Sequence, residues 1–160
     1  MLRGFLRTDD DVAGLVMRLT LGAVFFAHGA QKVLGWWGGP GASATIQGFA
    51  KMGMPPALTV LILAAELGGS VLLILGFLTR LGALGIGCVM AGAIFLVHSK
   101  VGFFMNWAGT QKGEGFEYHL LVLAITVFLM IRGAGAASVD RLLTSPAKKS
   151  LRTQVRPQAA

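Results

Sequence analysis

The sequence predicts an all-α integral membrane protein, a four-helix bundle with both chain ends in the cytoplasm. The first observation behind this prediction is composition, because the 160 residues are 54% hydrophobic and only 13% charged, with a mean hydropathy of +0.70. A soluble domain carries about 25% charged residues. The second observation is a set of four long apolar runs, and the third is an uneven distribution of lysine and arginine between the segments that join them.

The four apolar runs are long enough, or nearly so, to cross a hydrocarbon core of about 30 Å, which takes roughly 20 mainly apolar residues. Arg18 interrupts the first run and the fourth run is short, but their even spacing favours four membrane spans. The expected spans are residues 12–34, 56–77, 81–98 and 116–131.

The remaining segments define the domain organisation. Residues 1–11 are expected to form a cytoplasmic N-terminal segment rather than a signal peptide, because Asp9, Asp10 and Asp11 directly precede the apolar run. Residues 12–140 form the transmembrane domain, and residues 141–160 form a basic cytoplasmic tail. The single cysteine, Cys88, excludes a disulfide framework and a thiol-pair redox motif.

Lysine and arginine set the predicted orientation, because short loops rich in positive charge stay in the cytoplasm. Nine such residues fall on the side of the two chain ends and four on the other side. The nine are Arg3, Arg7, Arg80, Arg132, Arg141, Lys148, Lys149, Arg152 and Arg156; the four are Lys32, Lys51, Lys100 and Lys112. The basic tail lacks aromatic residues, so we interpret it as a topology signal and a partner for the anionic lipid bilayer, not for nucleic acid.

Arg18 and Glu66 are the two charges expected to lie furthest from a membrane surface. An ionisable residue inside the membrane is costly and therefore indicates a functional site or a paired charge. Helix rise places the two backbones at depths that an extended arginine side chain can bridge. The sequence thus predicts either a buried Arg18–Glu66 ion pair that locks two helices together or a proton or substrate site.

Three histidines form a second candidate site, because His28, His98 and His119 are all expected at the outer ends of their spans. Gln31, Lys32 and Glu117 belong to the same layer. A quinone head-group pocket, a proton relay, a bis-histidine haem or a metal held by His28, His98 and Glu117 would all suit this layer, although we assign no metal. The alternative is that these side chains simply face headgroups and water.

An ordered set of residues resembles the DoxX family of small bacterial membrane proteins. The resemblance covers most of the chain from Arg18 to Leu142. Its residues are Arg18, Leu21, Gly22, Phe26, His28, Gly29, Gln31, Lys32 and Gly35; Gly48, Phe49, Gly53 and Pro55; Glu66, Gly68, Gly69, Leu73, Gly76, Leu78, Thr79 and Arg80; Val97, His98, Gly102 and Glu117; and Gly133, Gly135, Ser138 and Asp140.

The resemblance implies a multi-pass protein of the bacterial inner membrane, described in this family as an oxidoreductase or as a subunit of quinone-linked oxidoreductase systems. In the namesake system a related subunit works with a partner to pass electrons from thiosulfate to quinone, and other members are linked to thiol handling. Because this chain has no cysteine pair, any thiol chemistry would come from a partner or substrate. The residues carried over are Arg18, His28, Gln31, Lys32, Glu66, His98 and Glu117; His119 is not part of the pattern.

The leading functional hypothesis is a quinone-linked oxidoreductase subunit that acts with a soluble or membrane redox partner. His28, Glu66 and Glu117 are the expected catalytic residues, with His28 and Glu117 exchanging protons. Arg18, Gln31, Lys32 and His98 are the expected cofactor-binding residues. Two alternatives remain open: a non-enzymatic scaffold for a soluble redox enzyme, and a small transporter that would need to form a homo-oligomer.

Overall fold

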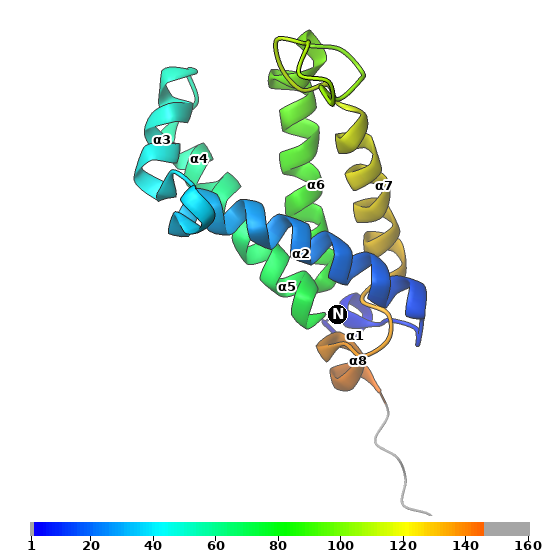
Figure 1. Ribbon diagram of the computed structural model, residues 1–160. Coiled ribbons are helices and arrows are strands. Elements are labelled where there is room, and N and C mark those ends of the chain that lie inside the picture. Colours follow the sequence, from blue (N-terminus) through cyan, green and yellow to red (C-terminus); the bar gives the residue numbers. More distant parts are fainter. Residues whose placement is uncertain (1, 146–160) are drawn as a thin grey trace, which may run out of the picture.

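The computed structural model describes residues 2–145, and these residues form helices joined by turns and loops (Figure 1). The predicted all-α class is therefore confirmed. Most of the predicted basic tail, from residue 146 onward, lies outside the described residues.

Four long helical segments correspond to the four apolar runs. They are α2 (Val12–Leu34), the consecutive α4 (Pro56–Leu63), η2 (Ala64–Gly68) and α5 (Gly69–Leu75), then α6 (Thr79–Leu96) and α7 (Glu117–Arg132). Three stretches are long and apolar enough to cross a membrane: Val12–Leu34, Pro56–Leu75 and Thr79–Lys100. The fourth segment, α7, has 16 residues and so extends about 24 Å, less than the hydrocarbon thickness of about 30 Å.

Short helices lie at both ends of this assembly. We call one end the terminal end, because α1 (Leu2–Leu6) and α8 (Val139–Thr144) lie together there (Figure 1). We call the opposite end the loop end, which carries η1 (Trp36–Gly38), α3 (Gly41–Lys51), η3 (His98–Lys100) and the loop of residues 101–116. Both described chain ends therefore lie at the same end of the molecule.

The bounds of α2 follow from its flanking residues. The Asp11 side chain accepts hydrogen bonds from the backbone N–H groups of Ala13 and Gly14, which supplies acceptors that the first helical turn lacks. Gly35 ends the helix in the left-handed conformation with φ 73°, which costs glycine little. Between these caps the stripe of Arg18, Gly22, Phe25 and Gly29 is buried, as its sequence spacing predicts.

Small residues bring the second and third apolar helices together. A Cβ added to Gly82 would lie 2.9 Å from the carbonyl oxygen of Gly69, so the two backbones touch. Ala65 likewise lies against Gly85.

The apolar core lies between α2, α5, α6 and α7. Its buried members are Leu21, Phe25, Leu73, Ala83, Ile86, Met90, Val122 and Leu129. These side chains pack the four helical segments against one another.

Candidate functional site

Glu66 lies at the centre of the candidate site, in a turn of π-helix. The segment η2 interrupts an otherwise α-helical rod between α4 and α5, and Glu66 is its third residue. Single π turns inside α-helices often occur at functional sites, because they alter the direction of the side chains they carry. Glu66 is only 2% exposed, so its carboxylate requires a partner.

Lys32 supplies that partner from the last turn of α2. Its Nζ donates to both carboxylate oxygens of Glu66 at 2.7 Å. The two side chains differ in exposure, with 30% of Lys32 and 3% of Glu66 accessible. The pair therefore has a buried carboxylate and an ammonium that reaches the edge of the protein.

Gly29 permits this pairing, because it lies one helical turn before Lys32 on the face of α2 that meets η2. A Cβ at Gly29 would lie 2.8 Å from the Cα of Leu67, the residue after Glu66. Real Cβ atoms essentially never approach backbone this closely, so only glycine lets α2 touch the π turn.

Arg18 corrects the sequence prediction, since it does not pair with Glu66. Its guanidinium lies at the terminal end, where it is 1% exposed and donates to five backbone carbonyl oxygens. The acceptors are Leu73, Ile74, Ala134, Ala136 and Ala137, at 2.6 to 3.1 Å.

A guanidinium has five N–H donors, and Arg18 has five acceptors within the protein. All five donors are used within the protein, so Arg18 is not among the residues that we assign to the candidate site. The side chain instead ties the C-terminal end of α5 to the segment that follows α7.

Asp140 completes the terminal end. Its carboxylate accepts from the backbone N–H groups of Leu78 and Thr79 at 2.8 and 3.0 Å, where α6 begins. It is 2% exposed, and its α8 is itself capped by the Ser138 hydroxyl. Sequence reasoning placed Asp140 only within the family pattern and missed this capping role.

Two neighbouring residues at the start of α7 carry buried polar atoms without hydrogen-bond partners among the described residues. They are the hydroxyl of Tyr118 and the Nδ1 atom of His119. Tyr118 packs against the apolar core. Sequence reasoning missed Tyr118, although the only tyrosine of a chain, placed at the start of an apolar run, is a signal that could have been used.

His98 and His119 stack beneath the loop of residues 101–116. Their ring centroids are 4.1 Å apart, and the Nδ1 of His98 lies 2.8 Å from the carbonyl oxygen of Glu114. Two imidazoles in contact leave no space for a macrocycle between them, so this pair does not fit a bis-histidine haem. In the part of the chain that the structure describes, no group of three or more His, Cys, Asp or Glu side chains could hold a metal ion.

The other predicted residues lie around this centre. His28 is exposed on α2, with its ring 6.4 Å from that of Phe25, and Gln31 is half-buried beside Lys32. The Glu117 carboxylate accepts from the backbone N–H of Met105 at 2.9 Å and from the indole of Trp107 at 3.3 Å. The predicted polar layer is thus divided into three groups: the Lys32–Glu66 ion pair, the His98–His119 contact, and Glu117, which holds the loop of residues 101–116.

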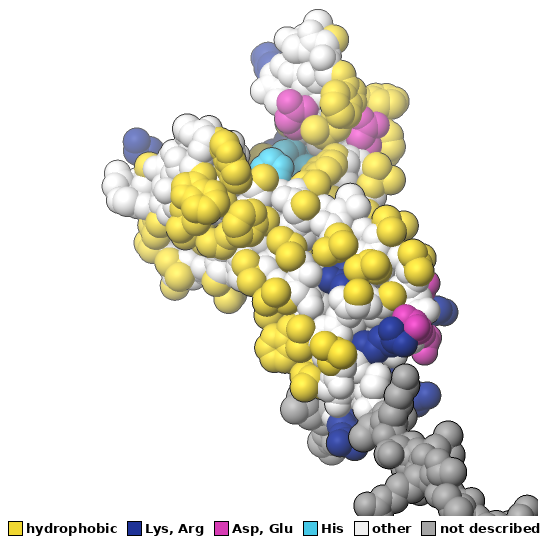
Figure 2. All heavy atoms as spheres, turned by 60° about the horizontal axis from the view of Figure 1, so that its bottom comes forward, with side chains coloured by type: hydrophobic (Ala, Val, Ile, Leu, Met, Phe, Trp, Pro, Cys, Tyr) yellow, Lys and Arg dark blue, Asp and Glu magenta, His cyan; other side chains and the backbone are white. Residues whose placement is uncertain are grey.

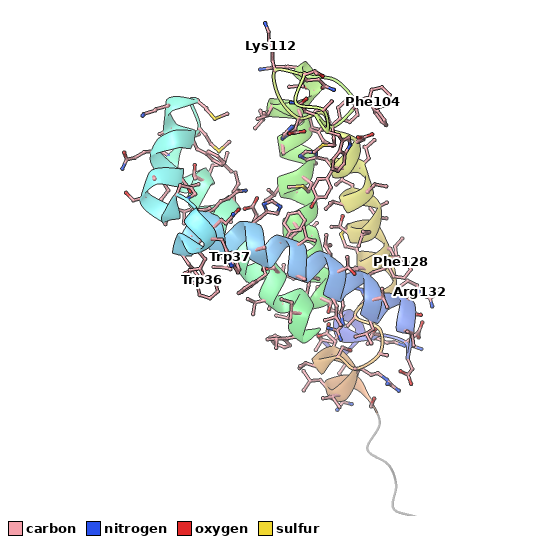
Figure 3. The ribbon with its side chains drawn as sticks, viewed as in Figure 1. Trp36, Trp37, Phe104, Lys112, Phe128 and Arg132 are labelled. Carbon is pink, nitrogen blue, oxygen red and sulfur yellow. The ribbon has the colours of Figure 1, made fainter. Side chains whose placement is uncertain are left out.

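The loop end is hollowed around these groups. The space-filling view shows histidine side chains in a recess between two projecting parts, one carrying α3 and the other the loop of residues 101–116 (Figure 2). Figure 3 shows Trp36 and Trp37 near the end of α2, on the side of the α3 projection, and Phe104 and Lys112 on the other. The recess therefore opens between segments far apart in the sequence.

These features define a small multi-pass membrane protein with a charge pair buried between its helices. The DoxX family model matches residues 13–99, which hold α2, the π turn and α6. The chain belongs to the DoxX family, as the sequence motifs predict.

Two relatives extend the comparison beyond the matched residues. The Escherichia coli (strain K12) "Inner membrane protein YqjF" is 34% identical over 134 residues, which cover 84% of this chain and 94% of that relative. The Bacillus subtilis (strain 168) "Putative oxidoreductase CatD" is 30% identical over 130 residues, covering 81% of this chain and 86% of that relative. No solved structure matches.

Proposed function

We propose that this DoxX protein is a quinone-linked oxidoreductase subunit of the bacterial inner membrane, and that the Lys32–Glu66 pair binds the quinone head group. The single observation that carries the proposal is the pair itself, in which the Glu66 side chain is 3% exposed and the Lys32 side chain 30% exposed, between helices that could span a membrane. The name of the Bacillus relative, which refers to an oxidoreductase, supports the reaction class.

The chemistry of the pair suits a molecule that arrives through lipid. A quinone has an apolar tail and carbonyl oxygens that accept hydrogen bonds, so it needs a donor at the edge of an apolar surface. The partly exposed ammonium of Lys32 is such a donor. Gln31, His28 and His98 lie in the same region and complete the proposed head-group pocket, with Gln31 offering a second amide donor.

Proton exchange follows from the same geometry. Reduction of a quinone to a quinol takes two electrons and two protons; a redox partner would supply the electrons, and the outer solvent would supply the protons. Lys32 stabilises the negative charge that develops on the quinone oxygen, and Glu66 passes protons to that oxygen. In the reverse direction Glu66 accepts a proton from the quinol.

The topology and the partner belong to the same proposal. We place α7 across the membrane as a fourth span, so that the terminal end faces the cytoplasm and the loop end faces outward. The partner would dock at the loop end, where the Trp107 side chain is 87% exposed.

The test is equilibrium binding of ubiquinone-1 to the full chain in mild detergent, measured by isothermal titration calorimetry. Glu66→Gln and Lys32→Met should each weaken binding tenfold or more, because each removes one charge of the pair that contacts the head group. Lys51→Met is the matched control, because Lys51 is an exposed lysine on α3 at the same end and should have no effect.

The double variant Lys32→Met with Glu66→Gln serves as the blank for quinone that partitions into detergent. Equal heats for the wild-type protein and this blank would overturn the proposal. So would a wild-type affinity that Glu66→Gln leaves unchanged.

A further inference from the structure

A cleft of about 480 Å³ lies at the loop end, beside the loop that joins α6 to α7. Its volume falls within the range of about 300–1,000 Å³ that is typical of ligand pockets. Two lysines and an amide form its polar part, and two phenylalanines form much of its apolar part. These residues are Lys100, Lys112, Gln111, Phe103 and Phe104. Figure 3 shows Lys112 and Phe104 on this loop.

No acidic side chain among residues 2–145 forms an ion pair with either lysine of this cleft. The ion pairs in that part of the chain use three other cations, Lys32, Arg132 and Arg141. Lys100 and Lys112 are both exposed. The cleft therefore keeps two positive charges that an anionic group from outside the chain can meet.

The acidic residues nearest to this cleft in the sequence hold the loop backbone instead. The Glu114 carboxylate accepts from the N–H of Asn106 at 2.7 Å, and the Glu117 carboxylate accepts from the N–H of Met105 at 2.9 Å. The Asn106 side chain and the Gln111 backbone exchange two further hydrogen bonds, at 2.9 and 3.0 Å. These contacts fix the shape of the loop, so the cleft is preformed, as ligand sites usually are.

The position of the cleft along α6 places it beside lipid headgroups. Lys100 is the last residue of the stretch Thr79–Lys100, which is long and apolar enough to cross a membrane. Phe103 and Phe104 follow it and are exposed, and exposed apolar side chains that lie together mark contact sites for membranes or partners. Phosphate groups of phospholipids are the anions that occur at this level.

We propose that the Lys100–Lys112 cleft binds the head group of one anionic phospholipid from the surrounding bilayer. The two ammonium groups pair with the phosphate, and Gln111 offers an amide donor to its oxygens. Phe103 and Phe104 contact the apolar part next to the head group. A zwitterionic head group carries a positive charge that the same lysines repel, so the cleft selects anionic lipid. This inference shares no residue with the proposed quinone site and does not rest on it.

The test is native mass spectrometry of the full chain in mild detergent, titrated separately with phosphatidylglycerol and with phosphatidylcholine of the same acyl chains. The wild-type protein should bind a first phosphatidylglycerol about tenfold or more tightly than phosphatidylcholine, because each lysine beside an anionic lipid contributes roughly fivefold in affinity. The double variant Lys100→Gln with Lys112→Gln should lose this preference. Its unfolding temperature without lipid should equal that of the wild-type protein, because both side chains are exposed.

Lys51→Gln is the matched control, because Lys51 is an exposed lysine on α3 at the same end and does not line the cleft. It should keep the preference for phosphatidylglycerol. The double variant Lys100→Arg with Lys112→Arg preserves both charges and should also keep it.

Equal binding of the two lipids by the wild-type protein would overturn the inference, and so would a preference that the double glutamine variant retains. Loss of the preference in Lys51→Gln would also overturn it, because net charge rather than the cleft would then select the lipid. Competition by millimolar inorganic phosphate, compared with ammonium acetate of equal ionic strength, separates a lipid site from a site for the free anion. Phosphatidylglycerol should remain bound; its displacement by phosphate alone would overturn the lipid assignment.

Discussion

Two regions of the molecule each bury a charge, and they treat it in opposite ways. At the terminal end, all five donors of Arg18 are used by backbone carbonyls, and Asp140 accepts from two backbone N–H groups. Glu66, midway along its own helical stretch, has a single charged partner, Lys32, whose side chain is partly exposed.

This difference is why we treat Arg18 as a structural charge and propose a functional role for Glu66. A group whose hydrogen bonds are complete has nothing left to offer a ligand, whereas an incomplete set can be completed by one. Burial does not make this distinction, since Arg18 and Glu66 are both buried. The number of remaining donors and acceptors does.

The largest expected effect is at Arg18. Replacement by methionine, Arg18→Met, keeps the length of the side chain but removes every donor, leaving the ends of α5 and the segment after α7 without their link. We expect a loss of about 4 kcal/mol or more in unfolding free energy, from several unsatisfied carbonyls at about 1–3 kcal/mol each. Thermal unfolding in mild detergent measures this loss.

Arg18→Lys provides the graded comparison, because an ammonium keeps the charge but offers three donors. Its stability should fall between those of the wild-type protein and Arg18→Met. A methionine variant as stable as the wild-type protein would contradict the structural assignment and return Arg18 to the candidate site.

Gly29→Ala should have an intermediate effect, because it introduces a steric overlap between α2 and the π turn. The new methyl group would lie 2.8 Å from the Cα of Leu67 and would push α2 away from the π turn. Overpacking of this kind costs about 1–3 kcal/mol and should separate Lys32 from Glu66. We expect a lower unfolding temperature together with a several-fold loss of ubiquinone-1 affinity.

Gly92→Ala is the control, because a Cβ there meets nothing within 4 Å; ubiquinone-1 affinity should be unchanged, and the unfolding temperature should stay the same or rise, since alanine favours the helix. If Gly29→Ala lowers stability without changing affinity, the close approach of α2 to the π turn is needed for folding alone.

The smallest effect is expected at Glu117, whose carboxylate contacts the loop rather than the ion pair. Glu117→Gln keeps an oxygen for the Met105 N–H, so the loop of residues 101–116 should lose less than about 1 kcal/mol of local stability. Hydrogen exchange of that loop measures the change. A loss of ubiquinone-1 affinity as large as that of Glu66→Gln would show that Glu117 has the catalytic role expected from the sequence.

The four long helical segments were predictable because they form within long apolar runs, and each of them begins and ends within two residues of the bounds expected from the sequence. The helix at 41–51 was not predicted, since its glycine and alanine content gives little periodicity and its segment was expected to be a loop. Hydropathy also does not reveal the π turn, which is a property of local hydrogen bonding.

The sequence predicted which residues belong to the candidate site, but not which of them contact one another. Lys32 and Glu66 both stood out as charges near or inside apolar runs, but the sequence paired Glu66 with Arg18. The acceptors of Arg18 are backbone carbonyls at the end of α5 and after α7, and a carbonyl has no sequence signature. Which charge is free to meet Glu66 therefore depends on contacts that only the folded chain reveals.

The acceptors of Arg18 also constrain how the protein is made. Synthesis proceeds from the N-terminus, so α2 is translated before Leu73 and Ile74, and long before Ala134, Ala136 and Ala137. Until the chain has grown past residue 137, α2 carries a cation whose full set of acceptors has not been translated. The segment that follows α7 therefore completes the hydrogen bonds of a helix made at the start of synthesis.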